Sequence, residues 1–333
     1  MTLKEIARLT GTSASAVSRV INDSGYVSEE KRRAIQKVLA DFDYHKKEKA
    51  AANPLTAATV LIIADSLDVS DAYADYIGGI NEELEAHGFC SYIYLSGFDH
   101  ENEAEQLKHA YGLGFAGVIM ISAIESPRLK ELLKKTKCPV IALNRYLRGV
   151  DIDTVVLDNY KVGYLATQRL IESGHKRVAH LAGLKDSTAS QDRVRGYIDA
   201  MRDAGLPIEE GFIAYGNHSY EKGGEYAERF GENGCTALFA ASDRMALGFM
   251  DALYRRGLEC PGDVSVICTE DTKNLMSGKV RLTTIGYHNR TLGKTAAQLL
   301  LERRADPKGE KKTISYAPQI IERDSISCLI SDN

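Results

Sequence analysis

The sequence predicts a small all-α head followed by a two-lobed α/β core. The chain has 333 residues, enough for two or three domains. Apolar residues recur at helical spacing in roughly the first 45 positions, whereas from Thr59 onward short β-branched runs alternate with longer amphipathic segments. This alternation continues for about 270 residues, more than one six-stranded sheet requires, so we expect two lobes with parallel sheets covered on both faces.

Composition is that of an ordinary globular protein, with 44% hydrophobic and 26% charged residues, which excludes a disordered chain or a fibre. The formal net charge of −4 is unevenly distributed. Residues 1–53 carry ten Lys/Arg against seven Asp/Glu, and the remainder carries an excess of seven acidic charges. A basic head on an acidic body is a weak indication of a polyanionic partner at the N-terminus.

We expect a cytoplasmic protein with no membrane partner. No stretch approaches the roughly 20 apolar residues that span a bilayer, and the opening residues contain no apolar signal region. The six cysteines lie far apart without a CxxC pair, which argues against a zinc ribbon or a dithiol redox site. We therefore expect six reduced thiols, most of them buried.

The head is predicted to contain three short helices. Thr2 and Glu5 fit a capping box at the first helix, and Gly11 suits its end. Ser13 is a suitable cap for the second helix, and Ser28 for the third. One small core is expected from the apolar residues Ile6, Ala7, Leu9, Val17, Val20, Ile21, Ala34, Ile35, Val38, Leu39 and Phe42. Residues 46–58 contain no large apolar residue before Leu55 and are interpreted as a linker, which Asn53-Pro54 biases away from helix.

In the core the alternating pattern predicts ten strands with helices between them. The strands are expected at 60–64, 91–95, 118–121, 140–143, 155–157, 178–182, 237–240, 264–268, 282–285 and 319–323. The helices include 73–87, 101–113, 160–173, 193–204, 222–230, 244–256 and 292–303.

Nothing in the sequence supports catalysis, a metal site or a cofactor. A GxGxxG pattern spans 112–117, but a predicted helix precedes it and a strand follows it. A dinucleotide fingerprint needs the opposite order, so we interpret this segment as a turn that ends a helix. No GxSxG, HExxH, P-loop or EF-hand pattern occurs, and the eight histidines show no ligand spacing.

The spacing of Ala7, Gly11 and Val17 is typical of a helix-turn-helix, in which the second helix enters a DNA major groove. A small residue lets the helices approach, glycine makes the turn, and an apolar residue anchors the second helix. A generic helical hairpin satisfies the same spacing. The surrounding residues Thr2–Ala7, Ser13–Asn22 and Tyr26–Ser28 closely resemble the head of the lactose-repressor/galactose-repressor family of bacterial transcription regulators.

Further landmarks of that family follow in order along almost the whole chain. They are Glu172–Ala179, Arg193–Tyr197, Ala241–Gly248, Pro261–Val266 and Leu282–Ile285. The resemblance implies a helix-turn-helix DNA-binding domain at 1–45, a linker or hinge at 46–58, and a two-lobed periplasmic-binding-protein-like core. The chain would cross three times between the lobes, which are expected at 59–158 plus 289–316 and at 159–288 plus 317–330.

The resemblance implies that a dimer binds a near-palindromic double-stranded operator. Ala14 and Ser15 would face base edges, as would Arg19, whose guanidinium can bind guanine or, alternatively, a phosphate. The positions that match backbone contacts are Thr2, Ser13, Ser18, Asn22, Tyr26 and Tyr44. The family's hinge helix inserts a leucine into the minor groove, but Asn53 stands at that position here and Lys46 replaces a usual proline. We therefore expect Lys46, Lys47 and Lys49 to bind phosphates, with less bending of the operator.

The resemblance also places a small-molecule effector, a sugar or sugar derivative, between the lobes. The matching pocket positions are Asp65, Tyr73, Asn144, Arg193, His218, Ser242, Glu270 and His288. Their polar groups suit hydroxyls and their aromatic groups suit the ring's C–H face. Glu270 and Ser242 depart from the usual Asp and Asn of the family, and Cys268-Thr269 replaces a common Gly-aromatic pair. Arg290 is expected near the cleft, where it would favour an acidic or phosphorylated sugar.

These features predict a non-enzymatic, DNA-binding repressor of a carbohydrate-utilisation operon, released when the effector re-angles the lobes. The chain ends without a leucine heptad tail, so we expect a homodimer rather than a tetramer. A regulator activated by a corepressor or by a partner phosphoprotein remains open within the family. A transport solute-binding protein is opposed by the helical head, and a nicotinamide-dependent enzyme by the misplaced glycine pattern.

Overall fold

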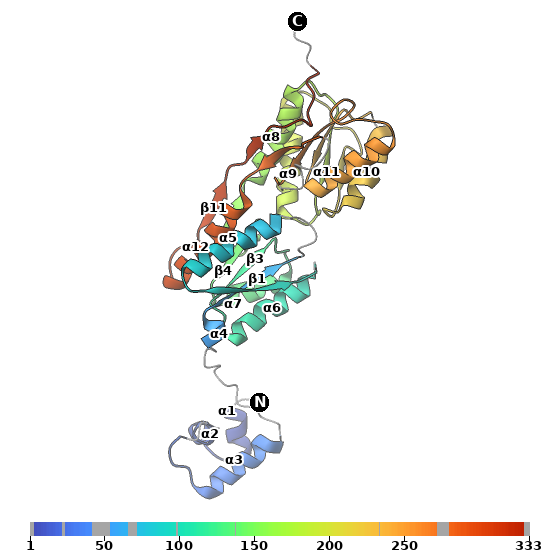
Figure 1. Ribbon diagram of the computed structural model, residues 1–333. Helices are drawn as coiled ribbons and strands as arrows, with labels where there is room; N and C mark the ends of the chain where they lie inside the picture. Colours follow the sequence, from blue (N-terminus) through green and yellow to red (C-terminus); the bar gives the residue numbers. More distant parts are fainter. Residues whose placement is uncertain are drawn as a thin grey trace. The chain divides into compact units, whose positions relative to one another are not determined.

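The computed structural model describes residues 3–21, 24–41, 54–65, 72–97, 99–136, 138–232, 234–271 and 280–329. The chain divides into two compact units, residues 1–52 and 53–333. Figure 1 shows the first as a helical unit and the second as two stacked α/β lobes. The predicted fold class is confirmed.

Three helices form the head: Leu3–Leu9 (α1), Ala14–Ile21 (α2) and Glu29–Asp41 (α3). The turn between α1 and α2 contains Gly11 with φ +59°, a left-handed conformation in which glycine avoids Cβ strain. The Oγ of Ser13 then accepts a hydrogen bond from the Ala16 amide at 3.2 Å, as an N-cap residue should. One small core unites the helices through Ile6, Ala7, Val17, Val20 and Ile35.

The first lobe is built on a six-stranded sheet of order β11-β5-β4-β3-β1-β2. Its strands are Thr59–Ala64 (β1), Cys90–Leu95 (β2), Gly117–Ile121 (β3), Val140–Leu143 (β4), Asp153–Leu157 (β5) and Thr313–Tyr316 (β11). Alternate residues of the central strands enter different cores: Val60 and Ile62 face one helical layer, while Leu61 and Ile63 face the other. This two-sided burial is why these strands appear in the sequence as continuous apolar runs.

The second lobe contains a matching sheet of order β12-β10-β9-β8-β6-β7. Its strands are Val178–Ala182 (β6), Ile213–Tyr215 (β7), Ala237–Ala240 (β8), Ser265–Thr269 (β9), Thr283–Gly286 (β10) and Gln319–Ile321 (β12). The expectation of purely parallel sheets was wrong at one place, because β12 pairs antiparallel with β10. Strands β7 and β11 were not predicted. Both are edge strands, and a half-exposed edge strand lacks the continuous apolar run of a central one.

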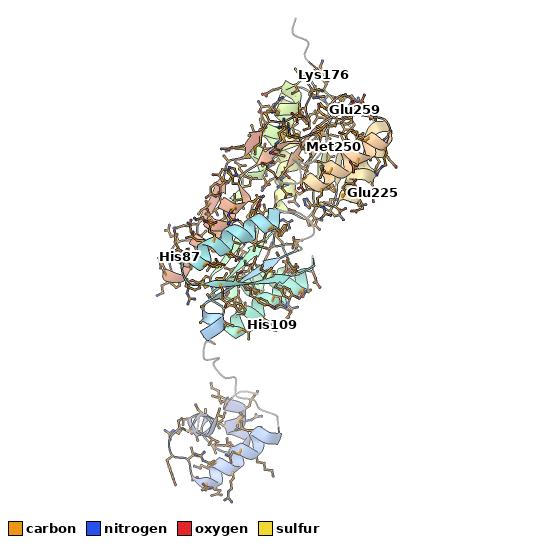
Figure 2. All side chains as sticks on the ribbon, viewed as in Figure 1. His87, His109, Lys176, Glu225, Met250 and Glu259 are labelled. Atoms are coloured by element: carbon orange, nitrogen blue, oxygen red, sulfur yellow. The ribbon has the colours of Figure 1, made fainter. Side chains whose placement is uncertain are left out.

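Helices cover both faces of each sheet (Figure 1). On the first lobe Ala72–Ala86 (α5) packs with Asn289–Ala305 (α12), opposite His100–Leu113 (α6) and Pro127–Lys135 (α7). On the second, Asn159–Glu172 (α8) packs with Thr188–Asp203 (α9), opposite Tyr220–Glu232 (α10) and Asp243–Arg255 (α11). Met250 of α11, labelled in Figure 2, lies in the apolar cluster between that helix layer and the sheet.

The α8–α9 pair crosses at glycines that bring the two backbones into contact. A Cβ built on Gly163 would lie 2.0 Å from the carbonyl oxygen of Arg193, and one on Gly196 would lie 2.1 Å from that of Tyr160. No larger residue fits at such a separation. The same reciprocal arrangement recurs where α5 crosses α12 and where α10 crosses α11.

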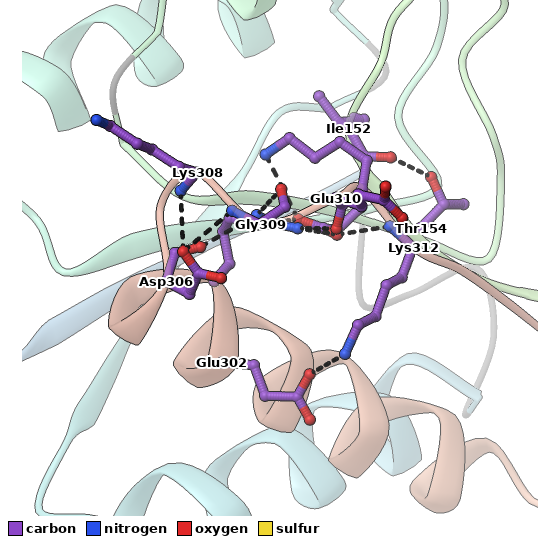
Figure 3. Close-up of polar contacts among 11 residues, drawn as sticks. Ile152, Thr154, Glu302, Asp306, Lys308, Gly309, Glu310 and Lys312 are labelled. Carbon is purple, nitrogen blue, oxygen red and sulfur yellow. Dashed lines mark hydrogen bonds and ion pairs between the residues drawn. The ribbon is translucent and has the colours of Figure 1, made fainter.

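A buried ion pair ties α12 to β5. Arg303 donates from Nε and from a terminal nitrogen to the two carboxylate oxygens of Asp153, at 2.7 and 3.0 Å. Both side chains are buried, and Arg303 also donates to backbone carbonyls of the following loop, including Gly309. Lys312 extends the network, because its amide donates to Asp153 at 2.9 Å. Figure 3 shows the Lys312 ammonium donating to Glu302 on α12.

The remaining fold predictions had mixed outcomes. The GxGxxG segment ends α6 with Gly114 at φ +74° and leads into β3, as predicted. The segment 46–58, interpreted as a linker, contains one described helical turn at its end, Pro54–Ala57 (α4), with proline at the first position. All six cysteines are free, but only Cys235, Cys260 and Cys268 are buried. Among the described helices, none is both long and apolar enough to cross a membrane.

Candidate functional site

The exposed side of α2 is the candidate nucleic-acid interface. Val17 and Val20 point into the head core, so the side chains on the opposite face of α2 are exposed to solvent. Ala14, Ser15 and Arg19 are exposed, and Ser18 is half-buried beside them. These are the residues that were predicted to face DNA from this helix.

Two further predicted contacts flank this face. Ser13 is exposed and caps α2, and Tyr26 is 87% exposed although it is a large aromatic residue. The stem of Arg19 passes near Gly25, with its Cδ 3.5 Å from where a Cβ would lie. Thr2, Asn22 and Tyr44 lie outside the described residues, as do Asn53 and the lysines of the linker. The DNA-contacting roles of all nine residues stay predictions.

A cavity between the two lobes is the candidate effector site. It lies at the carboxyl ends of the strands, where open α/β sheets place their ligands. Six of the eight predicted pocket residues line it: Asp65 after β1, Tyr73 on α5, Asn144 after β4, Arg193 on α9, His218 after β7 and Glu270 after β9. Their role in binding a ligand stays a prediction, but the fold brings them together.

Backbone strain is concentrated in this cavity. Within the described part of the chain, the non-glycine residues with positive φ are Ser122, Asn144, His218 and Glu270, with φ between 61° and 73°. All four line the cavity. Such conformations cost roughly 1–3 kcal/mol each and persist where the surrounding structure imposes them, typically at ligand sites. The strain is therefore independent support for a functional site here.

Hydrogen bonds orient the side chains. Arg193 donates from Nε to Asn159 at 2.8 Å, and from a terminal nitrogen to the Ala241 carbonyl and the Thr269 hydroxyl at 3.2 and 3.3 Å. The amide of Asn144 donates to the Ser122 hydroxyl at 2.9 Å.

On the first-lobe side, the Tyr73 hydroxyl donates to the Asp65 carboxylate at 3.2 Å. Burial, and after it the charge of Asp65, raises the pKa of Tyr73, so this hydroxyl stays a donor.

Two titratable groups are neutral at physiological pH. Burial, followed by the adjacent carboxylate of Asp65, raises the pKa of Glu103 to about 8, so that carboxyl stays protonated. Burial, followed by the positive charges of Arg145 and Arg193, lowers the pKa of His218 to about 3, so its ring is neutral. Burial also lowers the pKa of Arg193, although a guanidinium remains charged.

Hydrogen bonds join the two lobes near the cavity. The Thr188 hydroxyl on α9 donates to the Tyr146 carbonyl at 3.1 Å, and Arg148 donates to the side chain of Gln191 at 2.5 Å. The cavity volume is about 30 Å³, which is room for two or three water molecules. A sugar-sized ligand therefore requires the lobes to part or side chains to move.

Two predicted pocket residues lie elsewhere. Ser242 is fully buried, and its hydroxyl caps α11 by accepting from the Met245 amide at 3.2 Å. Its N-cap position turns the side chain toward the helix backbone instead of the ligand space. His288 is exposed at the start of α12, in a separate hollow with Arg290. Arg290, which was expected near the cleft, forms an ion pair with Glu82 at 3.0 Å, and its influence on the effector stays a prediction.

Five lining residues were missed: Ser122, Arg145, Ser187, Ala189 and Ser190. The predicted start of the helix at 193 was late, because α9 begins at Thr188 with Ser187 as its cap. The signal was present, since a serine followed by small residues is a common N-cap pattern. Arg145 directly follows Asn144 after the end of a strand, so the strand-end argument that selected Asn144 could also have selected Arg145.

Comparisons with known proteins agree with this architecture. The model described as "Bacterial regulatory proteins, lacI family" matches residues 2–47, and that described as "Periplasmic binding proteins and sugar binding domain of LacI family" matches residues 56–319. The transcriptional regulator GalR of Salmonella typhimurium strain SL1344 is 31% identical over 336 residues, covering 98% of this chain and 96% of that protein. The transcriptional repressor PurR of Vibrio parahaemolyticus is 28% identical over 331 residues, covering 98% and 99%.

A solved structure supports the same assignment. The complex of the transcriptional regulator CelR with cellobiose has a TM-score of 0.74 and 29% sequence identity, covering 98% of this chain and 99% of that one. The helix-turn-helix head and the two-sheet core match this family over nearly the full length of the chain. The chain therefore belongs to the LacI family of bacterial DNA-binding transcriptional regulators.

Proposed function

We propose that this protein represses a carbohydrate-utilisation operon and is released from its operator by a sugar-type effector bound between the core lobes. The protein acts in the cytoplasm as a homodimer and carries out no catalysis. The observation that carries the effector role is the convergence, in one inter-lobe cavity, of six family pocket positions and all four described non-glycine residues with positive φ.

The head reads operator DNA through the exposed face of α2. Arg19 binds guanine through its forked guanidinium, and Ala14 contacts a thymine methyl. Ser13, Ser18 and Tyr26 bind phosphates, as do Thr2, Asn22 and Tyr44, which set the register of the head without reading sequence. One head per half-site explains a near-palindromic operator.

The chemistry of the cavity suits a small hydroxylated ligand. Asp65, Asn144 and Glu270 supply acceptors and donors for hydroxyl groups, and Tyr73 presents an aromatic ring. A member of the family, CelR, has been solved with cellobiose, which supports a saccharide-related effector for this chain. We propose the lobe boundaries predicted above, 59–158 plus 289–316 and 159–288 plus 317–330, because β11 joins the first sheet and β12 the second.

Dimerisation uses the exposed edge of the first lobe. Strand β2 is the last of its sheet, and its side chains Tyr92, Ile93 and Leu95 are 57%, 37% and 44% exposed. Leu113 at the end of α6 adds a fourth exposed apolar group at 54%. An apolar sheet edge of this kind is normally covered by a partner. When the effector changes the angle between the lobes, the spacing of the two heads changes and operator affinity falls. Because the two binding events are coupled, operator DNA lowers the affinity for the effector by the same factor.

DNA binding is tested by selecting genomic fragments with the full chain and comparing wild type with Arg19→Ala. We expect Arg19→Ala to lose about 1–3 kcal/mol of discrimination between the selected fragment and a random competitor. Arg33→Ala is the matched control, because it removes one positive charge from an exposed site on α3. Selected fragments that wild type binds no better than random DNA would refute the regulator function.

The effector role is tested by repeating the gel shift with mono- and disaccharides. Weaker operator binding is the result we expect of an inducer. Stronger binding would identify a corepressor, and an unchanged shift with every metabolite would point to a partner protein, so either result contradicts the proposed release. Arg193→Lys should abolish the response while leaving ligand-free operator binding intact, because it removes the fork that Asn159 and Thr269 orient.

A further inference from the structure

The structure describes three deeply buried arginines, Arg145, Arg193 and Arg303, each at most 7% exposed. Arg303 is neutralised by the carboxylate of Asp153. Arg145 and Arg193 both line the inter-lobe cavity. Arg193 donates to neutral groups and also feels the negative charge of Glu270, and Arg145 donates to the Ser122 carbonyl. A buried charged group is costly unless its hydrogen-bonding atoms are satisfied, and Arg303 shows how this fold meets that cost elsewhere.

Two residues that line the cavity carry hydrogen-bond donors without a partner. Arg145 donates from a terminal nitrogen to the Ser122 carbonyl at 2.5 Å, but its Nε is buried with no hydrogen-bond partner. The hydroxyl of Ser190, a residue that is 3% exposed, is likewise buried without a partner. Buried polar atoms in folded proteins are almost always paired, so unpaired atoms facing a cavity mark places where a ligand atom belongs.

The same side of the cavity is formed by the first turn of a long helix. Helix α9 has 16 residues, and its cap Ser187 and first-turn residues Ala189 and Ser190 line the cavity. The Ser190 amide donates to the capping hydroxyl of Ser187 at 3.4 Å, whereas the amides before it in the first turn have no intrahelical acceptor, and the helix dipole adds positive potential there. Helix N-termini with free amides are well suited to bind anionic oxygens.

The carboxylates of the cavity have interactions of their own. Asp65 accepts from Tyr73 on the first-lobe side and lies next to the protonated Glu103. Glu270 lies at the end of β9, where its charge acts on Arg193 and on Tyr76.

We propose that the effector carries an anionic oxygen group, a carboxylate or a phosphate, which binds to Arg145, to Ser190 and to the first turn of α9. This inference rests on the proposed effector role of the cavity and specifies its ligand as a sugar acid or a sugar phosphate. The rest of the molecule then lies against Asp65, Tyr73 and Asn144, which suit hydroxyl groups. The role that the sequence assigned to Arg290 thus passes to Arg145.

The test measures thermal stability and binding by calorimetry, using the full chain with matched probes. The probes are D-glucose, D-glucuronate, D-glucose 6-phosphate and inorganic phosphate, all at the same concentration in the millimolar range. We expect at least one anionic probe to stabilise the protein more than D-glucose does. Inorganic phosphate has no stereochemistry to mismatch, and the two sugar derivatives separate the carboxylate class from the phosphate class.

Substitutions at Arg145 and Ser190 test whether the anionic probe binds at the proposed site. Arg145→Met should weaken binding of the anionic probe by about 10- to 100-fold, and Ser190→Ala by a smaller factor. Arg145→Lys, which keeps the charge but loses the fork, should give an intermediate loss and serves if Arg145→Met does not fold. Arg290→Met removes an exposed arginine outside the cavity and should change nothing.

The inference falls if no anionic probe binds in an Arg145-dependent manner, or if D-glucose binds as tightly as its anionic derivatives. Operator binding without ligand is measured on the same preparations. If a neutral sugar alone releases the operator, the regulator function stands and the anionic effector is refuted. If no DNA fragment is preferred in any state, the regulator function is refuted, whereas the Arg145 dependence still decides the ligand class.

Discussion

Gly163→Ala tests how the fold holds Arg193 in the cavity. The added methyl would lie 2.0 Å from the Arg193 carbonyl oxygen and 2.7 Å from its carbon, whereas ordinary contact begins near 3.4 Å. Because the clash is with backbone, no rotamer change relieves it, and α8 and α9 must separate by an ångström or more. Overpacking of this kind costs about 3 kcal/mol, against a gain of about 1 kcal/mol from alanine's helix propensity.

The net expectation is a loss of about 2 kcal/mol, which corresponds to a melting temperature lower by roughly 4–8 °C. Gly112→Ala is the control, because Gly112 is exposed on α6 and nothing lies within 4 Å of its added methyl. There the propensity gain acts alone, so stability should rise by up to about 1 kcal/mol. Thermal unfolding followed by circular dichroism compares the two variants. If Gly163→Ala is as stable as Gly112→Ala, the close helix crossing does not constrain this lobe as argued.

The remaining predictions concern the ion pair and the corrected pocket. Arg303→Met leaves the Asp153 carboxylate buried without its partner and should lower the free energy of unfolding by about 3–5 kcal/mol in a urea titration; a loss below about 1 kcal/mol would contradict the role given to the pair. Burial by itself raises the pKa of Asp153, but the hydrogen bonds and charges of Arg303 and its neighbours outweigh it and lower the pKa below its ordinary value. Because this pKa is lower in the folded state, ionised Asp153 stabilises the fold fully above the unfolded-state pKa near 3.9, and that contribution is lost as the pH falls through the lower folded-state pKa. The free energy of unfolding of wild type should therefore fall in this acidic range, whereas that of Arg303→Met should depend less on pH. Ser242→Ala removes the cap of α11 and should cost about 1 kcal/mol without changing effector affinity, and an affinity loss of tenfold would restore Ser242 to the pocket.

Local pattern determined much of this protein before any tertiary contact was considered. The buried strands β1, β3 and β4 appear as apolar runs because both of their faces are covered. The helix-turn-helix was predictable because Gly11 and Ser13 act on their own neighbours, through a left-handed turn and an N-cap. Six of eight pocket positions could be named because each follows a strand end or matches a family landmark.

Only the tertiary structure decided which of these groups meet. Ser242 and His288 each satisfied the local argument, yet one side chain turned to cap its helix and the other lies outside the cavity. The edge strand β11 gained its place by pairing with β5, an interaction between residues far apart in the chain that no local apolar pattern encodes. The tertiary structure also decided what each buried arginine meets: Arg303 pairs with the Asp153 carboxylate, whereas Arg145 donates to the Ser122 carbonyl and leaves its Nε without a hydrogen-bond partner. These partners are far from the arginines in the sequence, so no local pattern encodes whether a buried charge will be neutralised.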